Sequence, residues 1–488
     1  MSHKIAVIGS GFSSLSAAAY LAKAGHEVTI YEKNSTVGGR ARRLVKDGFT
    51  FDIGPSWYWM PDIFERFFAD FGKKPSDYYQ LDKLNPAYSV VFEDEKITIA
   101  DNLPAIKETF EKVEAGSSKP LQEFMDVASE NYDIAIKNLV YRPGESPLEL
   151  VTLQTVKKLG AFVGNVSKDV RKKFSNPKLV SILEFPVLFL GATPSNTPSF
   201  YNFMNYADFG LGTWHPKGGM YEVILGMKKL AQELGVVIKT NSPVSKILVD
   251  KNNNAEGLII DDQKFLYDVV LSGADYHHSE TLLEEKHRQY SENYWKKKTF
   301  APSSLIFYVG FDKKLKNIDH HNLFFDTDFE KHADEIYEHP KWPDDPLFYA
   351  NFTSVTDPST APEGCENGFF LIPLAPGLED TPELRNQYFD IVMSRFEERT
   401  GQNVRDHIIV KESFCVNDFI KEYNSYKGNA YGMANTLTQT AFLRPNLRSR
   451  KVNNLYFTGQ LTVPGPGVPP SLISGKLVAE LIEKHSPS

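Results

Sequence analysis

A glycine-rich turn near the amino terminus has the residues and spacing of a dinucleotide-binding site. Gly9 allows a tight turn, and Gly11 lets the backbone approach a pyrophosphate at the positive end of the following helix. Ser14 stands where such turns often have a third glycine, a position that serves helix–strand packing. Glu32 follows ~20 residues beyond the turn, where its carboxylate can accept hydrogen bonds from a ribose diol. These residues predict that the chain binds a dinucleotide.

The segments on either side of this turn have the pattern of a βαβ unit. Residues 4–8 are apolar up to the first glycine and predict a buried parallel strand. Residues 15–24 are rich in alanine and have apolar residues at helical spacing, and Gly25 is expected to end that helix. Residues 26–31 predict the second strand. This order of elements places both glycines and the carboxylate at one edge of a parallel sheet.

Two further segments are predicted to complete the site. Gly39 and Arg40 belong to a Gly-Gly-Arg segment that supplies backbone amides and a guanidinium for phosphate groups. Near the carboxyl terminus, residues 454–459 predict a strand that ends in glycine. A loop rich in glycine and proline then leads into a helix over residues 471–484, whose amino-terminal N–H groups can face a bound ring system. We therefore expect the two ends of the chain to form two walls of one site.

Length and composition favour a protein of two domains. The chain has 488 residues, of which 41% are hydrophobic, and this length exceeds what one core usually supports. The net charge of −8 provides no basic field for a nucleic acid, so no nucleic-acid partner is expected. Cys365 and Cys415 are too few for a disulfide framework, and the first residues lack the apolar length of a signal peptide. These features predict a cytoplasmic protein.

The two domains are predicted to be discontinuous in sequence. The stretch 73–214 has long amphipathic patterns and few glycines, which indicates a largely helical insertion, and residues 268–274 predict a strand that returns to the parallel sheet. Short strands of a small antiparallel ribbon are expected at residues 236–239, 244–249 and 257–260, and further strands at 305–309, 348–352 and 369–373. The predicted class is α/β, with a Rossmann-like dinucleotide-binding domain (1–72, 215–290 and 424–488) and an inserted α+β substrate domain (73–214 and 291–423).

No side chain stands out as a catalytic acid or base. Glu184 lies in the most apolar stretch, where burial raises the pKa of a carboxyl group, so a neutral acid and a satisfied core carboxyl are both open. Arg142 is a second weak candidate, equally compatible with a surface turn. The pairs His277-His278 and His320-His321 lack the spacing of known metal sites, and we expect no metal.

Motifs that extend from end to end of the chain resemble those of the bacterial-type phytoene desaturases, carotenoid desaturases among the amine-oxidase-like FAD flavoproteins. Two positions depart from that pattern: Ser14 often has a glycine counterpart, and Val463-Pro464-Gly465 stands where the family often has His-Pro-Gly. The motifs are GSGFSSL, GGRA, GFTFDIGP, FPVLFLGATP, TWHPKGG, SGADYHHSETLL, DPSTAPEG, AFLRPN and NLYFTGQLTVPGPGVPPSLISGK.

The resemblance implies FAD as the cofactor and a C40 carotenoid as the substrate, with quinone or oxygen as the electron acceptor. Hydrogen would be removed from a C–C bond flanked by double bonds, by hydride transfer to the flavin and loss of a proton. Phe185, Phe189 and Trp214 are expected to line the substrate site. The residues expected to bind FAD are Gly9, Gly11, Phe12, Ser13, Ser14, Glu32, Lys33, Gly39, Arg40, Gly54, Pro55, Ser56, Val244, Gly459, Gly467 and Val468.

A C40 hydrocarbon resides in a bilayer, so we expect peripheral association with the inner face of the cell membrane. The stretch from Leu179 to Leu190 is the candidate for an interfacial entrance, and a buried core helix is an equal alternative. Three other functions remain open: a later-acting desaturase or isomerase of a hydroxylated or cyclised carotene, an amine oxidase, and a non-catalytic escort of prenyl or polyene chains.

Overall fold

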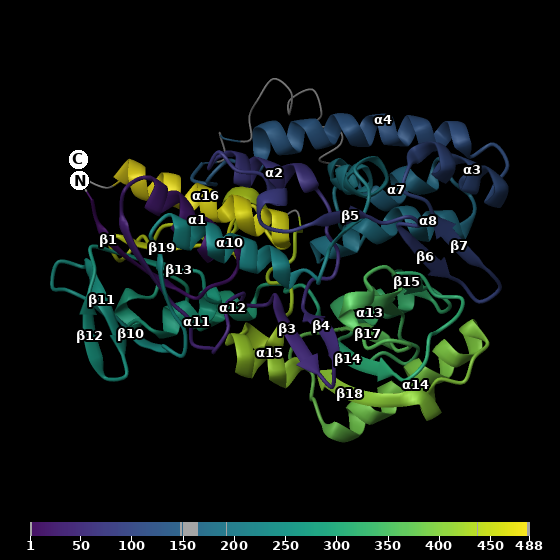
Figure 1. The fold of residues 1–488 in the computed structure, drawn as a ribbon. Helices are drawn as coiled ribbons and strands as arrows, with labels where there is room; N and C mark the ends of the chain where they lie inside the picture. The colour runs from purple at the N-terminus through teal and green to yellow at the C-terminus, as the bar shows by residue number, and fades with distance from the viewer. Residues whose placement is uncertain (1, 147–148, 150–163, 192, 437, 486–488) are drawn as a thin grey trace.

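Two β-sheets form the framework of the molecule, one toward each end of its long axis (Figure 1). The computed structural model describes residues 2–146, 149, 164–191, 193–436 and 438–485. The first sheet is entirely parallel and has the strand order β19-β13-β1-β2-β9. Its strands are β1 (Lys4–Ile8), β2 (Glu27–Tyr31), β9 (Val237–Lys239), β13 (Val269–Ser272) and β19 (Leu455–Phe457).

Helices from both ends of the chain pack together beside the parallel sheet. Helix α1 (Phe12–Lys23) follows the glycine turn, and its alanines and leucines are buried against the sheet and against α16 (Val468–His485). Figure 1 shows the two helices side by side, although they come from opposite ends of the sequence. Helix α10 (Tyr221–Glu233) contacts α1, and α2 (Pro61–Ala69) contacts α16.

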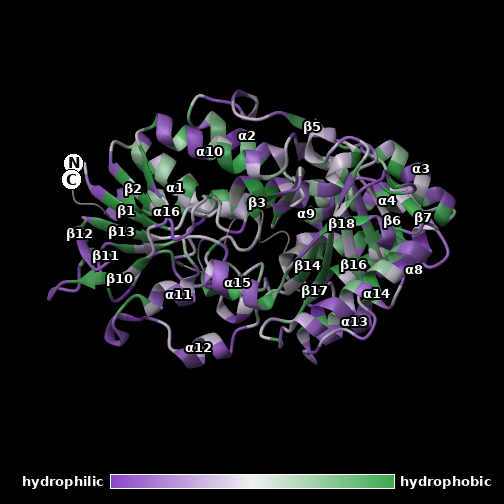
Figure 2. Cartoon of the chain, turned by 60° about the horizontal axis from the view of Figure 1, so that its bottom comes forward, coloured by the Kyte–Doolittle hydropathy of each residue, from purple (hydrophilic) through white to green (hydrophobic). Residues whose placement is uncertain are grey.

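The second sheet has seven strands in the order β18-β14-β17-β16-β15-β6-β7. Every residue of β14 is buried, because α14 (Pro382–Thr400) packs on one face of the sheet while the other face belongs to the main core. Figure 2 shows hydrophobic residues gathered along the strands of both sheets, whereas α12 (Glu292–Lys296) and α13 (Phe329–Tyr337) on the outside are largely hydrophilic. The strands are β6 (Tyr88–Val91), β7 (Lys96–Ile99), β14 (Ser303–Phe311), β15 (His321–Phe324), β16 (Phe348–Asn351), β17 (Glu366–Leu374) and β18 (Ile408–Phe414).

Shorter elements connect the two sheets. The small ribbons are β3 (Arg42–Lys46) with β4 (Phe49–Ile53), β5 (Leu81–Lys83) with β8 (Trp214–Pro216), and β10 (Val244–Val249) with β11 (Ala255–Ile260) and β12 (Gln263–Leu266). The remaining helices used below are α3 (Leu103–Val113), α4 (Ser118–Ile134), η2 (Ala135–Leu139), α7 (Val166–Arg171), α8 (Pro177–Glu184), η4 (Phe185–Leu190), α9 (Phe203–Asn205), α11 (Tyr276–Thr281), α12 (Glu292–Lys296), α13 (Phe329–Tyr337), α15 (Val416–Tyr423) and η12 (Ala441–Leu443).

The expected α/β class with a Rossmann-like parallel sheet is confirmed, and one strand assignment is corrected. The strand expected at residues 236–239 in an antiparallel ribbon is β9, which pairs in parallel with β2 through Thr29 and Val237. The insertion expected to be largely helical contains α3, α4, α7 and α8, and it also supplies β6 and β7, which complete the seven-stranded sheet. The corrected strand β9 has three residues, too few for periodicity to indicate its partner.

The apolar stretch from Leu179 to Leu190 forms α8 and η4 in the interior of the protein. Leu179, Leu183 and Val187 are completely buried. The interfacial-entrance interpretation is therefore wrong for the buried side chains of this stretch, because their apolar surface is already covered by the core. Among the described residues, no helix combines the length and hydropathy needed to cross a bilayer.

The contact between α1 and α16 depends on Gly475. A Cβ at this position would lie 2.5 Å from the carbonyl oxygen of Ser13 and 2.8 Å from the backbone nitrogen of Ala17. Backbone atoms of a buried helix cannot move aside as a side chain can, so the two helices approach this closely only where the side chain is absent.

We expect the Gly475→Ala substitution to lower the free energy of unfolding by about 1–3 kcal/mol through overpacking. Chemical denaturation, followed by circular dichroism, measures this loss. Glu480→Ala on the exposed face of the same helix is the control and should change stability by less than ~0.5 kcal/mol. Equal stability of the two variants would contradict the proposed close contact.

Candidate functional site

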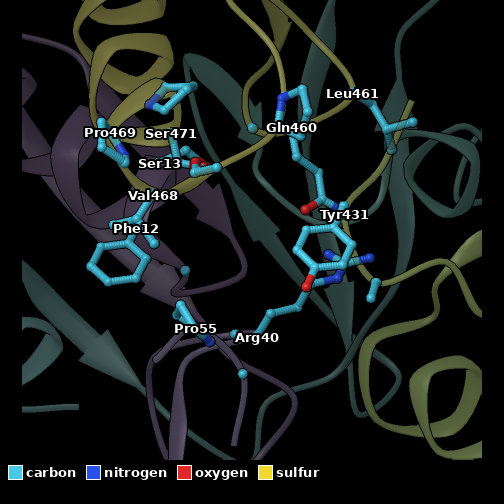
Figure 3. Close-up of a pocket in the computed structure, with 18 of the residues that line it drawn as sticks. Phe12, Ser13, Arg40, Pro55, Tyr431, Gln460, Leu461, Val468, Pro469 and Ser471 are labelled. Atoms are coloured by element: carbon cyan, nitrogen blue, oxygen red, sulfur yellow. The ribbon is translucent and has the colours of Figure 1, made fainter. Parts of the chain in front are cut away.

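One large cavity of about 940 Å³ extends from the parallel sheet to the seven-stranded sheet. Its first part lies at the carboxyl ends of β1, β13 and β19, where ligands of open parallel sheets usually bind. Its second part is bounded by residues of β14, β16 and α13. Figure 3 shows the first part, with Phe12 and Val468 on one side and Arg40 extending toward Tyr431 and Gln460 on the other.

The structure brings all the predicted cofactor-binding residues to the wall of this cavity except Ser14. They are Gly9, Gly11, Phe12, Ser13, Glu32, Lys33, Gly39, Arg40, Gly54, Pro55, Ser56, Val244, Gly459, Gly467 and Val468. These residues are distributed over the whole length of the chain, and the parallel arrangement of β1 and β19 gathers them at one edge. The two predicted walls therefore do face each other.

The glycine turn has the geometry required to hold a pyrophosphate. Gly9 has φ of +87°, a conformation that glycine adopts without strain. A Cβ on Gly11 would meet no atom within 4 Å, so it would project into open space at the cavity wall. In the described part of the chain no side chain caps the amino terminus of α1, which leaves its N–H groups available to an anion. The turn therefore fits the phosphates of FAD.

Glu32 lies at the cavity wall with only 4% of its surface exposed. Its Oε2 accepts hydrogen bonds from the backbone N–H of Ser10 at 3.0 Å and from the hydroxyl of Ser10 at 2.6 Å. Its Oε1 accepts from the backbone N–H of Asn34 at 2.9 Å. These donors hold the carboxylate in one orientation at the end of β2, where it can accept hydrogen bonds from a ribose.

Arg40 connects the amino-terminal unit to Gln460 of the predicted carboxyl-terminal wall, and also to Asp275 and the Tyr423–Ser425 segment, which the sequence did not predict in the site. Its guanidinium lies 3.7 Å from the carboxylate of Asp275, donates to Ser425 Oγ at 2.9 Å and lies over the ring of Tyr423. The side-chain amide of Gln460 is oriented so that its oxygen faces the donors of Gly432 and Arg40. This oxygen accepts hydrogen bonds from both terminal nitrogens of Arg40, at 3.2 and 3.1 Å.

Burial lowers the pKa of Arg40 and raises that of Asp275, so each ion is stabilised mainly by its partner in this wall. Asp275 also caps α11 by accepting from the backbone N–H groups of His277 and His278. A signal for Asp275 was present in the sequence, because it follows directly after the small residues that end β13. Tyr423 and Ser425 had no such signal, since only the fold places them beside Arg40.

Ser14 packs between α1 and β13 instead of facing the cavity. Its side chain is completely buried, and a Cβ at Gly273 would lie 2.0 Å from Ser14 Oγ. The space made by the missing side chain at Gly273 is thus occupied by the Ser14 hydroxyl. The prediction that Ser14 contacts the cofactor is therefore wrong. Ser14 instead has the helix–strand packing role that is expected of its position.

The second part of the cavity is apolar and aromatic. Phe185 lies on its wall as predicted, together with Trp57 and Trp59, whose rings lie 5.8 and 6.2 Å from the ring of Phe185. Trp214 is placed elsewhere: it pairs with Tyr58 through β8, and its indole N–H donates to the carbonyl of Leu211. The side chain of Phe189 lies outside the described part of the structure.

The two weak catalytic candidates, Glu184 and Arg142, lie in different surroundings. Glu184 is 3% exposed, is not part of the cavity wall and pairs with Arg171 at 3.3 Å, as expected of a satisfied core carboxyl. Arg142 does lie on the cavity wall. His277 is hydrogen-bonded to Glu292 at 3.1 Å, and among the described residues no cluster of three or more His, Cys, Asp or Glu could hold a metal ion.

Comparison with protein families and curated proteins gives full-length matches. A family described as flavin containing amine oxidoreductase matches residues 12–483. A carotenoid 3,4-desaturase of Haloarcula japonica is 42% identical, covering 98% of this chain and 97% of that protein. A 4,4'-diapophytoene desaturase (4,4'-diaponeurosporene-forming) of Staphylococcus haemolyticus is 33% identical, covering 98% of each.

Comparison with solved structures shows the same fold at low sequence identity. An oxidoreductase from Methanosarcina mazei has a TM-score of 0.63 at 19% identity, covering 98% of this chain and 100% of that chain. A putrescine oxidase bound to putrescine has a TM-score of 0.61 at 14% identity, covering 99% of this chain and 100% of that chain. The arrangement of the parallel sheet and the second sheet is therefore shared with these oxidoreductases.

We expect Glu32→Gln to weaken FAD binding by about 10- to 100-fold, because an amide cannot replace both carboxylate oxygens as acceptors. Titration of the apoprotein with FAD, followed by flavin fluorescence, measures the change. Glu27→Gln at the exposed start of the same strand is the matched control and should bind FAD as the unmodified protein does. Unchanged affinity of the Glu32 variant would show that this carboxylate does not contact the cofactor.

Proposed function

The chain belongs to the flavin-containing amine oxidoreductase family, and from this premise we propose that it is a carotenoid desaturase. Its cofactor is FAD. The proposal is that the enzyme oxidises a CH–CH bond in a long polyene and extends the conjugated system. The observation that carries it is the continuity of the cavity, in which a dinucleotide-binding turn opens into a wall of aromatic and aliphatic side chains.

The shape and lining of the cavity fit a ligand with no charge. Residues from α9, α13 and β16 contribute Phe203, Ile336 and Phe348 to the second part of the wall, far in sequence from the glycine turn. Burial of a hydrocarbon against such a wall contributes roughly 25 cal/mol for each Å² removed from water. When bound, FAD supplies the acceptor for the hydride that leaves the substrate. The protein supplies the position of the chain and the exclusion of water.

Two candidate substrates, phytoene and a carotene that is already conjugated, are each favoured by a different observation. The motifs of the chain favour phytoene, with products of the lycopene type. The higher identity to a carotenoid 3,4-desaturase favours a later step, on a carotene that is already conjugated. Val463, at the position where phytoene desaturases often have histidine, lies on the cavity wall and is consistent with a changed substrate position. The non-catalytic escort is set aside, because the family is one of oxidoreductases.

Expression of the chain in two bacterial hosts, one that accumulates phytoene and one that accumulates lycopene, tests both substrates. Formation of lycopene in the first host supports phytoene desaturation. Conversion of lycopene or its hydroxylated derivative to a more conjugated pigment, with phytoene unaltered, supports the later step. Chromatography with absorbance detection identifies the products. Unaltered carotenes in both hosts, despite a purified protein that contains FAD, would contradict the proposed desaturase.

The final electron acceptor is proposed to be a quinone or oxygen. Reoxidation of the reduced enzyme by a soluble quinone without oxygen, compared with reoxidation in air, separates the two.

We also propose that the protein associates with the cytoplasmic face of the cell membrane near the end of α4. The cavity wall there includes Val140 of the chain that follows η2 and Phe442 of η12. Leu443, next to Phe442, is 40% exposed. An exposed leucine beside the wall of an apolar cavity is suited to contact acyl chains from which the substrate enters.

We expect Leu443→Lys to reduce co-sedimentation with phosphatidylcholine vesicles by roughly 10-fold, because a side chain worth about 1.5–3 kcal/mol on burial is replaced by a charge. Leu266→Lys is the control, since Leu266 is 63% exposed on β12 and is not part of the cavity wall. Equal sedimentation of the two variants would place the membrane contact elsewhere on the protein.

A further inference from the structure

The hydroxyl group of Tyr349 occupies an unusual position on the cavity wall, because a buried imidazole lies directly behind it. Tyr349 belongs to β16 and lines the cavity. Its hydroxyl lies 2.6 Å from Nδ1 of His321 and 3.0 Å from the hydroxyl of Ser56. Ser56 belongs to the loop after β4 and also lines the cavity. The phenol therefore connects the cavity to a side chain that has no contact with it.

We propose that Tyr349 is the catalytic residue that accepts the substrate proton during desaturation, and that His321 is the positioning residue that receives the proton of the phenol. The proposal rests on the desaturase function proposed above. It also gives a role to His321, which belongs to the pair His320-His321 in the sequence. Among the described residues no metal cluster accounts for this pair.

The hydrogen bonds of His321 determine the direction of proton movement. Nδ2 of Asn351 lies 3.2 Å from His321 Nδ1. An amide nitrogen can only donate, so Nδ1 is an acceptor and the ring proton is on Nε2. The hydroxyl of Tyr349 consequently donates to Nδ1, and its oxygen keeps lone pairs for a proton from the cavity. The pairing of β15 with β16, which places His321 opposite Asn351, fixes this arrangement.

The ring of His321 is kept neutral in the resting protein. Burial and the nearby His215 lower the pKa of His321 well below its ordinary value, so Nδ1 is free to accept a proton. Burial also raises the pKa of Tyr349, which keeps the phenol protonated and able to donate. Nε2 of His321 is buried and has no hydrogen-bond partner among the residues that the structure describes.

Two features offset part of the cost of the imidazolium that would form, a cost that arises from burial and from the nearby His215. The ring of Trp57 stacks on that of His321 with centroids 4.0 Å apart and an interplanar angle of 8°, an arrangement in which the indole face attracts a cation. On the other side, His320 lies 4.4 Å away and continues to His215, which is hydrogen-bonded to the carboxylate of Asp357 at 3.3 Å. This buried carboxylate is the negative charge nearest to the end of the row of histidines.

The proposed step balances as follows. One carbon of the CH–CH bond loses a hydride to FAD, which takes both electrons of that C–H bond. The adjacent carbon loses a proton to the oxygen of Tyr349, and the electron pair of its C–H bond becomes the new double bond. At the same time the phenol proton moves to Nδ1 of His321. Tyr349 is thereby unchanged, and the imidazolium holds the one proton released.

The test uses Tyr349→Phe, which removes the hydroxyl and keeps the ring. Purified holoenzyme is mixed without oxygen with phytoene or lycopene in phosphatidylcholine vesicles, and bleaching of the flavin is followed in H₂O and in D₂O. We expect bleaching to slow by about 100-fold or more, and the solvent isotope effect of the unmodified enzyme to disappear. Tyr308→Phe is the matched control, because Tyr308 is a buried tyrosine of β14 that is not part of the cavity wall.

Two further measurements separate this role from a structural one. His321→Gln combined with Tyr349→Phe should be no slower than the slower single variant, since both residues act on one proton. FAD content should match that of the Tyr308 variant. A Tyr349 variant that keeps its rate or its solvent isotope effect would overturn the proposal, and so would slower bleaching that is accompanied by loss of FAD.

A measurement without substrate distinguishes failure of this proposal from failure of the desaturase function. Nitrogen-15 NMR of histidine-labelled protein, with His321 assigned through the His321→Gln variant, reports which ring nitrogen carries the proton. The expected result is a proton on Nε2 and a shift of the Nδ1 signal in Tyr349→Phe. A proton on Nδ1 would overturn the proposed transfer even if a carotene bleaches the flavin. Absence of bleaching by either carotene in the unmodified enzyme would instead contradict the desaturase function.

Discussion

The close contact of α1 with β13 and α16 is the constraint on which the rest of the structure depends. Ser14 fills the space left by the missing side chain of Gly273, and Gly475 lets α16 approach the backbone of α1. These contacts bring the first and last helices of the chain to the same edge of the parallel sheet. Because a site for an extended cofactor needs donors from several segments, this packing is what makes one cavity wall from distant parts of the sequence.

Each of the two sheets forms a chemically different part of the cavity wall. The parallel sheet provides the polar part of the cavity, where Glu32 and Arg40 are oriented by fixed partners. The seven-stranded sheet provides an apolar wall, and only a few polar groups interrupt it. Arg40 lies where the two parts meet, in contact with Asp275, Tyr423 and Gln460. A reaction that moves charge between a hydrocarbon and a flavin requires such a boundary, since isolated charge is costly within an apolar wall.

Polar groups in the apolar part of the cavity are informative because each has a cost. The hydroxyl of Tyr349 is compensated by Ser56 and His321, and the imidazole lies behind the wall where it does not contact a hydrocarbon. Glu184 shows the opposite case, a buried carboxyl whose ion pair with Arg171 accounts for it without any contact with the cavity. Burial alone therefore does not distinguish a polar group of the site from a polar group of the core. The difference is that the hydroxyl of Tyr349 faces the cavity, whereas the carboxyl of Glu184 faces Arg171.

The sequence by itself determined the βαβ unit, the family and most of the cofactor wall, because Gly9, Gly11 and Glu32 act through backbone geometry and spacing along adjacent elements. Only the tertiary structure decided which residues meet across long sequence separations. It placed Asp275 and Tyr423 beside Arg40, assigned Ser14 to helix packing, removed Trp214 from the cavity and joined β6 and β7 to the second sheet. The physical reason is that sequence periodicity reports which face of an element is buried, whereas the partner of that face depends on how the whole chain packs.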